Sequence, residues 1–78
     1  MNMAKFRLQP VVFDHRKGAI VHYGRIRELS SEQVHEAKAE ADQVALLQGV
    51  NCLQILREDD TVVAFRMTDP ETGHAHWT

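Results

Sequence analysis

The chain has 78 residues, enough for one domain with one modest hydrophobic core. Its composition, 44% hydrophobic and 26% charged, is typical of a folded globular protein and excludes a disordered chain. Nine basic and eleven acidic residues give a formal net charge of −2, so neither sign is in enough excess to indicate a partner by itself.

Segments for export or membrane insertion are not expected. No apolar run approaches the roughly 20 residues that span a bilayer, and residues 1–5 lack an apolar signal core. Cys52 is the one cysteine, which excludes an internal disulfide and fits a reducing compartment. We therefore expect a single domain over residues 1–78 in the cytoplasm.

A first strand is predicted over residues 5–14. Phe6 and Leu8 alternate there with polar residues, the period of a half-buried strand. Pro10 removes a donor from the hydrogen-bond ladder, which suits an edge strand or a bulge. Val11, Val12 and Phe13 could therefore face either side of the sheet.

A turn over residues 14–18 leads into a second strand over residues 18–29, with Gly18 free to take a positive φ. Gly24 in this strand favours either a close approach of the helix or a bulge. The alternation predicts four residues that face the helix: Ile20, His22, Gly24 and Ile26.

The one long helical pattern covers residues 30–49. Ser30 and Gln33 predict a capping box at its start, and Gly49 is placed to take the left-handed position after its end. The apolar residues of one arc are expected to pack on the sheet, with alanines giving a flat surface. These are Val34, Ala37, Ala41, Val44 and Ala45. Glu32, Glu36 and Glu40 form an acidic ridge on the opposite side.

A hairpin is predicted from strands over residues 51–57 and 61–68. A two-residue turn would put Leu53 and Ile55 on the face of Ala64 and Arg66, whereas a three-residue loop would align them with Val63, Phe65 and Met67. A slip of one residue exchanges the two faces, and the apolar pattern prefers the three-residue loop. The residues that then point outward are Cys52, Gln54, Val62, Ala64 and Arg66.

Residues 69–73, Asp-Pro-Glu-Thr-Gly, form a strong turn signal before a short last strand. They resemble the turn of chignolin-type designed mini-hairpins. That resemblance implies three facing pairs: Thr68 with Ala75, Met67 with His76, and Arg66 with Trp77. The fold class predicted for the chain is α+β, an antiparallel sheet of four to five strands with one helix packed on one face, in the order ββαβββ.

The outer sheet face collects basic residues interleaved with two aromatic ones, and we predict it as the partner-binding surface. Such a face suits phosphates and stacked bases, and it equally suits an acidic protein surface. The competing interpretation is a solvated face with Arg66 over Trp77 as a local cation–π pair. The predicted partner-binding residues are Lys5, Arg7, Tyr23, Arg25, Arg27, Arg66 and Trp77.

Two further surfaces are candidate binding sites. The acidic ridge could bind a basic partner or imitate a nucleic-acid backbone, or it is a solvated helix face with acids favoured near the N-terminus by the helix dipole. Leu46 and Leu47 lie off the apolar arc, so an oligomerising or antitoxin-like module is another interpretation. We expect a monomer or a weak dimer that does not bind membranes.

No catalytic or metal motif is found. His74 and His76 share a strand face that His22 could approach, but a metal site wants three or four ligands with a supporting second shell. Cys52 and Asp69 complete no nucleophile–base set, and the chain has no Gly-rich phosphate loop. We expect no enzyme activity, no cofactor and no metal.

The layout as a whole resembles the small phage-encoded anti-CRISPR proteins that act on type I CRISPR–Cas complexes, especially compact type I-F inhibitors. Features in common are a polar helix start after the second strand, Ala37-Lys38 within the helix and Gly49-Val50 leading into the third strand. Ala64-Phe65 in the hairpin and a late Trp77 complete them. The resemblance implies a non-enzymatic protein that occupies a nucleic-acid-binding surface of a Cas complex, and it assigns no individual residue.

The function predicted from the sequence is therefore a phage or mobile-element binding protein that inhibits a CRISPR–Cas surveillance complex through a charged surface. Its expected partner is a protein, which under the resemblance is a subunit of the Cas complex. The alternative is a small domain that binds DNA or RNA with its basic and aromatic sheet face.

Overall fold

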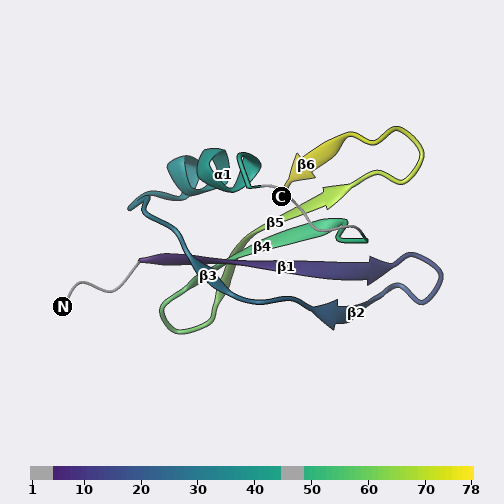
Figure 1. Cartoon of the computed structure of the whole chain (residues 1–78), viewed down its shortest axis with the longest axis horizontal. Helices are drawn as coiled ribbons and strands as arrows, with labels where there is room; N and C mark the ends of the chain where they lie inside the picture. The colour runs from purple at the N-terminus through teal and green to yellow at the C-terminus, as the bar shows by residue number, and fades with distance from the viewer. Residues whose placement is uncertain (1–4, 45–48) are drawn as a thin grey trace.

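The structure, a computed structural model, describes residues 5–44 and 49–78. These residues form a six-stranded antiparallel sheet with one helix packed on it, which confirms the predicted α+β class (Figure 1). The elements are β1 (Phe6–Asp14), β2 (Ala19–Tyr23), β3 (Arg27–Glu28), α1 (Val34–Asp42), β4 (Cys52–Arg57), β5 (Val62–Thr68) and β6 (Ala75–Trp77).

The strand order is β2-β1-β4-β5-β6, and β3 pairs with the start of β1. The predicted second strand is therefore broken into β2 and β3, which share one edge of β1. Gly24 lies at the break and donates its N–H to the Pro10 carbonyl at 2.7 Å. A Cβ at Gly24 would lie 2.9 Å from that oxygen, so the close approach requires glycine here. The glycine thus faces β1 and not the helix.

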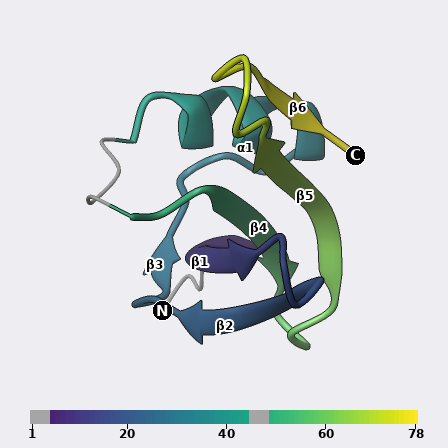
Figure 2. The ribbon, with the colours of Figure 1, turned by 90° about the vertical axis from the view of Figure 1, so that its right-hand side faces the viewer.

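Figures 1 and 2 show β2 on the opposite side of the molecule from α1 and β6. β1 and β4 lie between them, in the middle of the strand order. The two edges of the sheet are therefore far apart, and only the β6 edge adjoins the helix.

The β4–β5 hairpin has the predicted three-residue loop. The Arg57 N–H donates to the Thr61 carbonyl at 2.9 Å, which leaves residues 58–60 in the loop, and Asp60 closes it with a φ of 69°. Leu56 then pairs with Val62, but Ile55 pairs with Ala64. Val63 is therefore an extra residue in β5, a β-bulge.

This bulge reverses the predicted facing of β5. The one-residue shift turns Ala64 and Arg66 to the face of Leu53 and Ile55. The prediction that Phe65 and Met67 share the face of Leu53 is wrong, as is the outward direction of Ala64. Val63 still packs against the core, because a bulge places two neighbouring residues opposite one.

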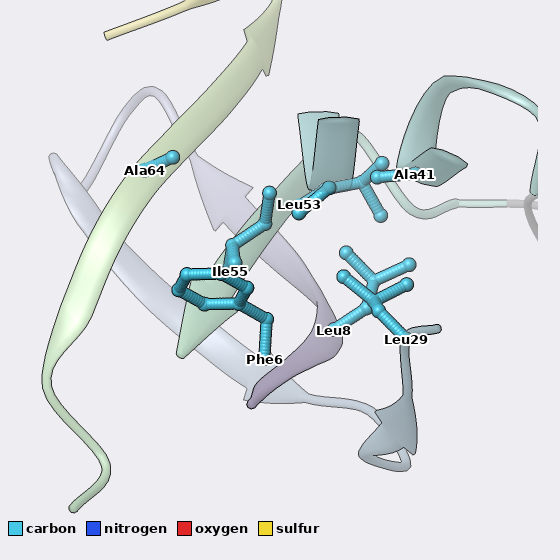
Figure 3. Packing of buried hydrophobic residues seen from close by; sticks show 8 residues of the cluster. Phe6, Leu8, Leu29, Ala41, Leu53, Ile55 and Ala64 are labelled. Carbon is cyan, nitrogen blue, oxygen red and sulfur yellow. The ribbon is translucent and has the colours of Figure 1, made fainter. Parts of the chain in front are cut away.

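The hydrophobic core lies between the sheet and α1, and Figure 3 shows its side chains pointing toward one another. Ala37 and Ala41 are fully buried, so the flat alanine surface of the helix is confirmed. Ile26 is 40% exposed and is not a core residue, because it lies in the link between β2 and β3. The buried cluster consists of Phe6, Leu8, Leu29, Ala37, Ala41, Leu53, Ile55 and Ala64.

A second bulge explains the position of Ile20. Val12 pairs with His22 and Phe13 pairs with Ile20, which leaves Val21 as the extra residue in β2. The shift turns Ile20 to the other face from His22, so the two cannot both face the helix as predicted. Ile20 is half-buried and does not belong to the core cluster.

A second buried group lies on the other face of the sheet. Val11, Cys52 and Leu56 are buried there beside Gln54, which is only 7% exposed. Gln54 donates to the Gln9 side chain at 2.7 Å, so its amide is satisfied. Cys52 and Gln54 do point away from the helix, as predicted, but they are buried. Burial raises the pKa of the Cys52 thiol, which therefore behaves as a small apolar group.

The start of α1 differs from the prediction. The helix begins at Val34 with Gln33 as its N-cap, and no side chain caps it. Ser30 and Ser31 instead donate both their N–H and their O–H groups to the Glu40 carboxylate, at 2.8–3.1 Å. Donation from the Ser30 N–H, followed by the other serine donors, holds the pKa of Glu40 below its ordinary value.

At the other end the helix reaches Asp42, short of the predicted residue 49. Gly49 has the predicted positive φ, 92°, but the prediction that it directly follows the helix end is wrong, because Gln43 is the C-cap of α1. The predictions for Ala45, Leu46 and Leu47 lie outside the described residues.

Overfilling the alanine surface should destabilise the fold. Ala41→Leu is expected to lower the free energy of unfolding by about 1–3 kcal/mol, because the added methyl groups have no space between α1 and the sheet. Ala39→Leu is the matched control, since Ala39 is exposed on the same helix. Thermal unfolding measures both, at about 4–8 °C per kcal/mol for a chain of this size. Equal melting temperatures for the two variants would contradict this packing.

Glu40 should make stability depend on pH. Because its pKa is lowered in the folded state, its contribution is present at neutral pH and is lost as the pH falls through the folded-state pKa. Glu40→Gln should therefore cost on the order of 1 kcal/mol at neutral pH and much less in acid. Urea unfolding of wild type and variant at both pH values measures this, with Glu32→Gln as control. A cost that stays the same in acid would exclude the carboxylate as its source.

Candidate binding surface

The seven predicted partner-binding residues do not share one face. Arg66 pairs with Trp77 across β5 and β6, so the predicted register of this hairpin is confirmed, as are the pairs Thr68–Ala75 and Met67–His76. The bulge, however, turns Arg66 to the helix side, and Trp77 follows it. The Asp42 carboxylate of α1 then forms an ion pair with Arg66 at 3.2 Å and accepts a hydrogen bond from the Trp77 indole at 3.1 Å.

Arg7 and Lys5 are also engaged within the chain. Arg7 faces away from the helix, but its guanidinium donates to the Asp60 carboxylate and to the Arg57 carbonyl. The Lys5 ammonium lies 5.8 Å from the centroid of the Phe6 ring. Both residues therefore have an intramolecular contact in place of the predicted free position on a common face.

The remaining predicted residues, Tyr23, Arg25 and Arg27, lie at the edge formed by β2 and β3, where all three are exposed. Arg27 pairs with Leu8, so it lies on the helix side of the sheet, while Tyr23 pairs with Val11 on the other. These residues therefore meet along an edge and not on a face.

The structure adds two cations to this edge. Arg16 and Lys17 lie in the turn that leads into β2, and both are exposed. Within the described residues, none of the four cations along the edge takes part in an ion pair. We name as the basic edge the four cations Arg16, Lys17, Arg25 and Arg27 together with the three exposed apolar or aromatic side chains Val21, Tyr23 and Ile26.

Sequence reasoning missed Arg16, Lys17 and the apolar part of this edge. A signal was available, because residues 15–27 hold four of the nine basic residues and none of the eleven acidic ones. Val21, Tyr23 and Ile26 are 50%, 58% and 40% exposed, and they are three of the four large hydrophobic side chains that are exposed among the described residues. The basic edge therefore combines free positive charge with accessible apolar surface.

Acidic residues gather on the other side of the molecule. Residues 32–42 contain four of the eleven acids, on and just before α1, and α1 lies opposite β2 (Figure 2). This separation of charge is partial, because the β4–β5 loop, which carries Glu58, Asp59 and Asp60, reaches the same side of the molecule as β2. Glu40 and Asp42 are used in internal contacts, whereas Glu32 and Glu36 are exposed.

We searched the described residues for groups of side chains that could hold a metal ion or a small ligand. Among residues 5–44 and 49–78, no three His, Cys, Asp or Glu side chains form a group that could hold a metal ion. His22 and His76 lie on β2 and β6, the opposite edges of the sheet. A shallow pocket of about 270 Å³ lies between Lys5, Phe6 and the β4–β5 loop. Its charged groups of both signs point to no particular ligand.

Comparison with known proteins found no match to this chain. The sequence matches no family model, and it has no significant match among curated proteins or solved structures. None of the helical residues that the structure describes belongs to a segment able to span a bilayer.

Loss of the Asp42 carboxylate should loosen β6. Asp42→Asn removes the ion pair with Arg66 and weakens the acceptor for the indole, so the free energy of unfolding should fall by about 1 kcal/mol. Trp77 is the single tryptophan, so its fluorescence reports the change directly. The emission should shift to longer wavelength as the indole becomes more exposed.

Glu36→Gln, an exposed acid on the same helix, serves as the control and should leave the emission unchanged. If Asp42→Asn also left the emission unchanged, Trp77 could not be held at α1 by this carboxylate.

Proposed function

We propose that the protein is a non-enzymatic binding protein that docks an acidic region of a partner protein on its basic edge. The observation that carries the proposal is the run of four exposed cations, with no acid among residues 15–27, beside three exposed apolar or aromatic side chains. Arginine and tyrosine are the residues that most often anchor protein interfaces. Positive charge of this kind also accelerates association with an acidic partner.

Nucleic acid is a less favoured partner for this surface. The predicted stacking platform combined Tyr23 and Trp77 with the cations, but Trp77 is held at the helix by Asp42. Tyr23 is then the one exposed aromatic ring of the basic edge. Single-strand binding relies on several stacked bases as well as phosphate contacts. The apolar side chains Val21 and Ile26 can pack against apolar side chains of a protein partner, whereas a phosphate backbone offers them no such contact.

Inhibition of a type I CRISPR–Cas complex is a second, more specific proposal. The resemblance implies occupation of a nucleic-acid-binding surface, which is basic and would be matched by acidic residues. Glu32 and Glu36 are exposed on the side opposite the basic edge and supply such charge. Co-purification with a Cas complex, lost on reversing these two glutamates, would support this proposal, and failure to protect an infecting phage would count against it.

The main proposal is tested by selection from a random peptide library displayed on phage. Peptides that bind the wild-type protein should be enriched in Asp and Glu, and Arg25→Glu should lose them because it reverses one charge of the basic edge. Lys38→Glu makes the same change in net charge on α1 and is the matched control, which should keep them.

Results of two kinds, from the peptide selection and from DNA binding, would contradict the proposal. One is selection of peptides without acidic enrichment, or retention of the acidic peptides by Arg25→Glu. The other is binding to single-stranded or duplex DNA, with affinity falling by about 0.7–0.9 log unit per log unit of salt for each phosphate contact. That second result would favour the nucleic-acid alternative.

A further inference from the structure

We infer that the partner segment binds as an added β-strand along β2, an inference that rests on the proposed function. The segment has defined chemistry: an extended run of a few apolar residues with acidic residues at both ends. Strand addition of this kind draws affinity from main-chain hydrogen bonds and selectivity from side chains. The basic edge offers both kinds of contact.

The main chain of β2 has a free side. In the described part of the chain, β2 pairs with β1 alone and forms one edge of the sheet. Gly24 donates its N–H to Pro10 of β1. Because neighbouring residues of an antiparallel ladder point their amide groups in opposite directions, the N–H and C=O of Tyr23 point away from β1. They are available to a strand added from outside.

The cations stand at both ends of this free edge. Arg16 and Lys17 precede β2, and Arg25 and Arg27 follow it. An added strand that covers the five residues of β2 would therefore place its own ends near positive charge. Acidic residues at those ends gain attraction from these cations, none of which takes part in an ion pair within the described chain.

A second copy of this chain fits the edge poorly. If two β2 strands paired antiparallel over their full length, Lys17 of one copy would lie opposite Arg25 of the other. If the two strands were shifted by two residues, Lys17 would lie opposite Arg27. Like charges directly opposite each other are destabilising in a sheet. The same cations that repel a second copy attract an acidic segment, so they select the partner.

The other edge of the sheet lacks these features. β6 has three residues, and the turn before it carries Asp69 and Glu71. Trp77, its largest side chain, contacts the helix. β2 is longer and carries two half-exposed side chains, Val21 and Tyr23, that can pack against those of an added strand.

A protective role for the edge makes the opposite prediction. Bulges and positive charges on edge strands are also devices that prevent pairing with other chains, and Val21 is a bulge residue. Under that interpretation no peptide adds to β2, whatever its charge. The role of main-chain hydrogen bonds is tested with a peptide that keeps its acidic residues but cannot form those bonds.

The experiment uses three synthetic peptides with the same centre of alternating valine and threonine. One has two glutamates at each end, the second has two lysines at each end, and the third repeats the first with N-methyl groups on the central amides. Fluorescence anisotropy measures their binding to the full chain. The glutamate peptide should bind, the lysine peptide should not, and N-methylation should weaken binding at least about tenfold through lost main-chain hydrogen bonds.

Amide hydrogen exchange provides the measurement on the protein. The Tyr23 amide should exchange fast in the free protein and slow down when the glutamate peptide binds, with no such change for the lysine peptide. Equal binding of the N-methylated peptide with an unchanged Tyr23 amide would overturn strand addition and leave charge-based docking standing. No binding of the glutamate peptide would overturn the proposed function as well. Protection of Tyr23 that grows with protein concentration would assign the edge to a second copy.

Discussion

Val63 is an extra residue in β5, and the one-residue shift that it introduces determines which side chains of the two C-terminal hairpins meet α1. The shift brings Ala64 opposite Ile55, where a small side chain leaves room for the core next to the alanine surface of the helix. It also brings Arg66, and with it Trp77, to the Asp42 carboxylate. The helix and β6 are thereby joined through one acidic side chain, and the packing of both depends on the register of β5.

The same shift decides where free positive charge is left. Without it, Arg66 would lie on the face away from the helix, remote from Asp42. With it, Arg66 is paired with Asp42 and Arg7 with Asp60, whereas the four cations along β2 and β3 have no ion pair among the described residues. The exposed acids Glu32 and Glu36 lie on the opposite side, with the helix. The proposed binding edge therefore consists of cations that these internal ion pairs do not use.

Local signals in the sequence predicted local structure well. The α+β order, the turn at residues 69–73 and the register of β5 with β6 follow from residue types a few positions apart. The bulges at Val21 and Val63 could not be predicted in this way, because each depends on how a strand fits a partner distant in the sequence. The three-residue loop was correctly predicted, and yet the facing of β5 was wrong, since the bulge lies beyond the loop. Likewise, Ser30 donates to Glu40 ten residues away in place of capping the helix.

Nuclear magnetic resonance tests the register of β5 most directly, through cross-strand nuclear Overhauser effects in the free protein. We expect Ile55 to lie opposite Ala64 and Leu53 opposite Arg66, with contacts from the Trp77 indole to the end of α1 around Asp42. Contacts that place Ile55 opposite Val63 and Leu53 opposite Phe65, with the indole remote from the helix, would contradict it. Arg66 and Trp77 would then lie on the outer face of the sheet, as the sequence pattern predicts.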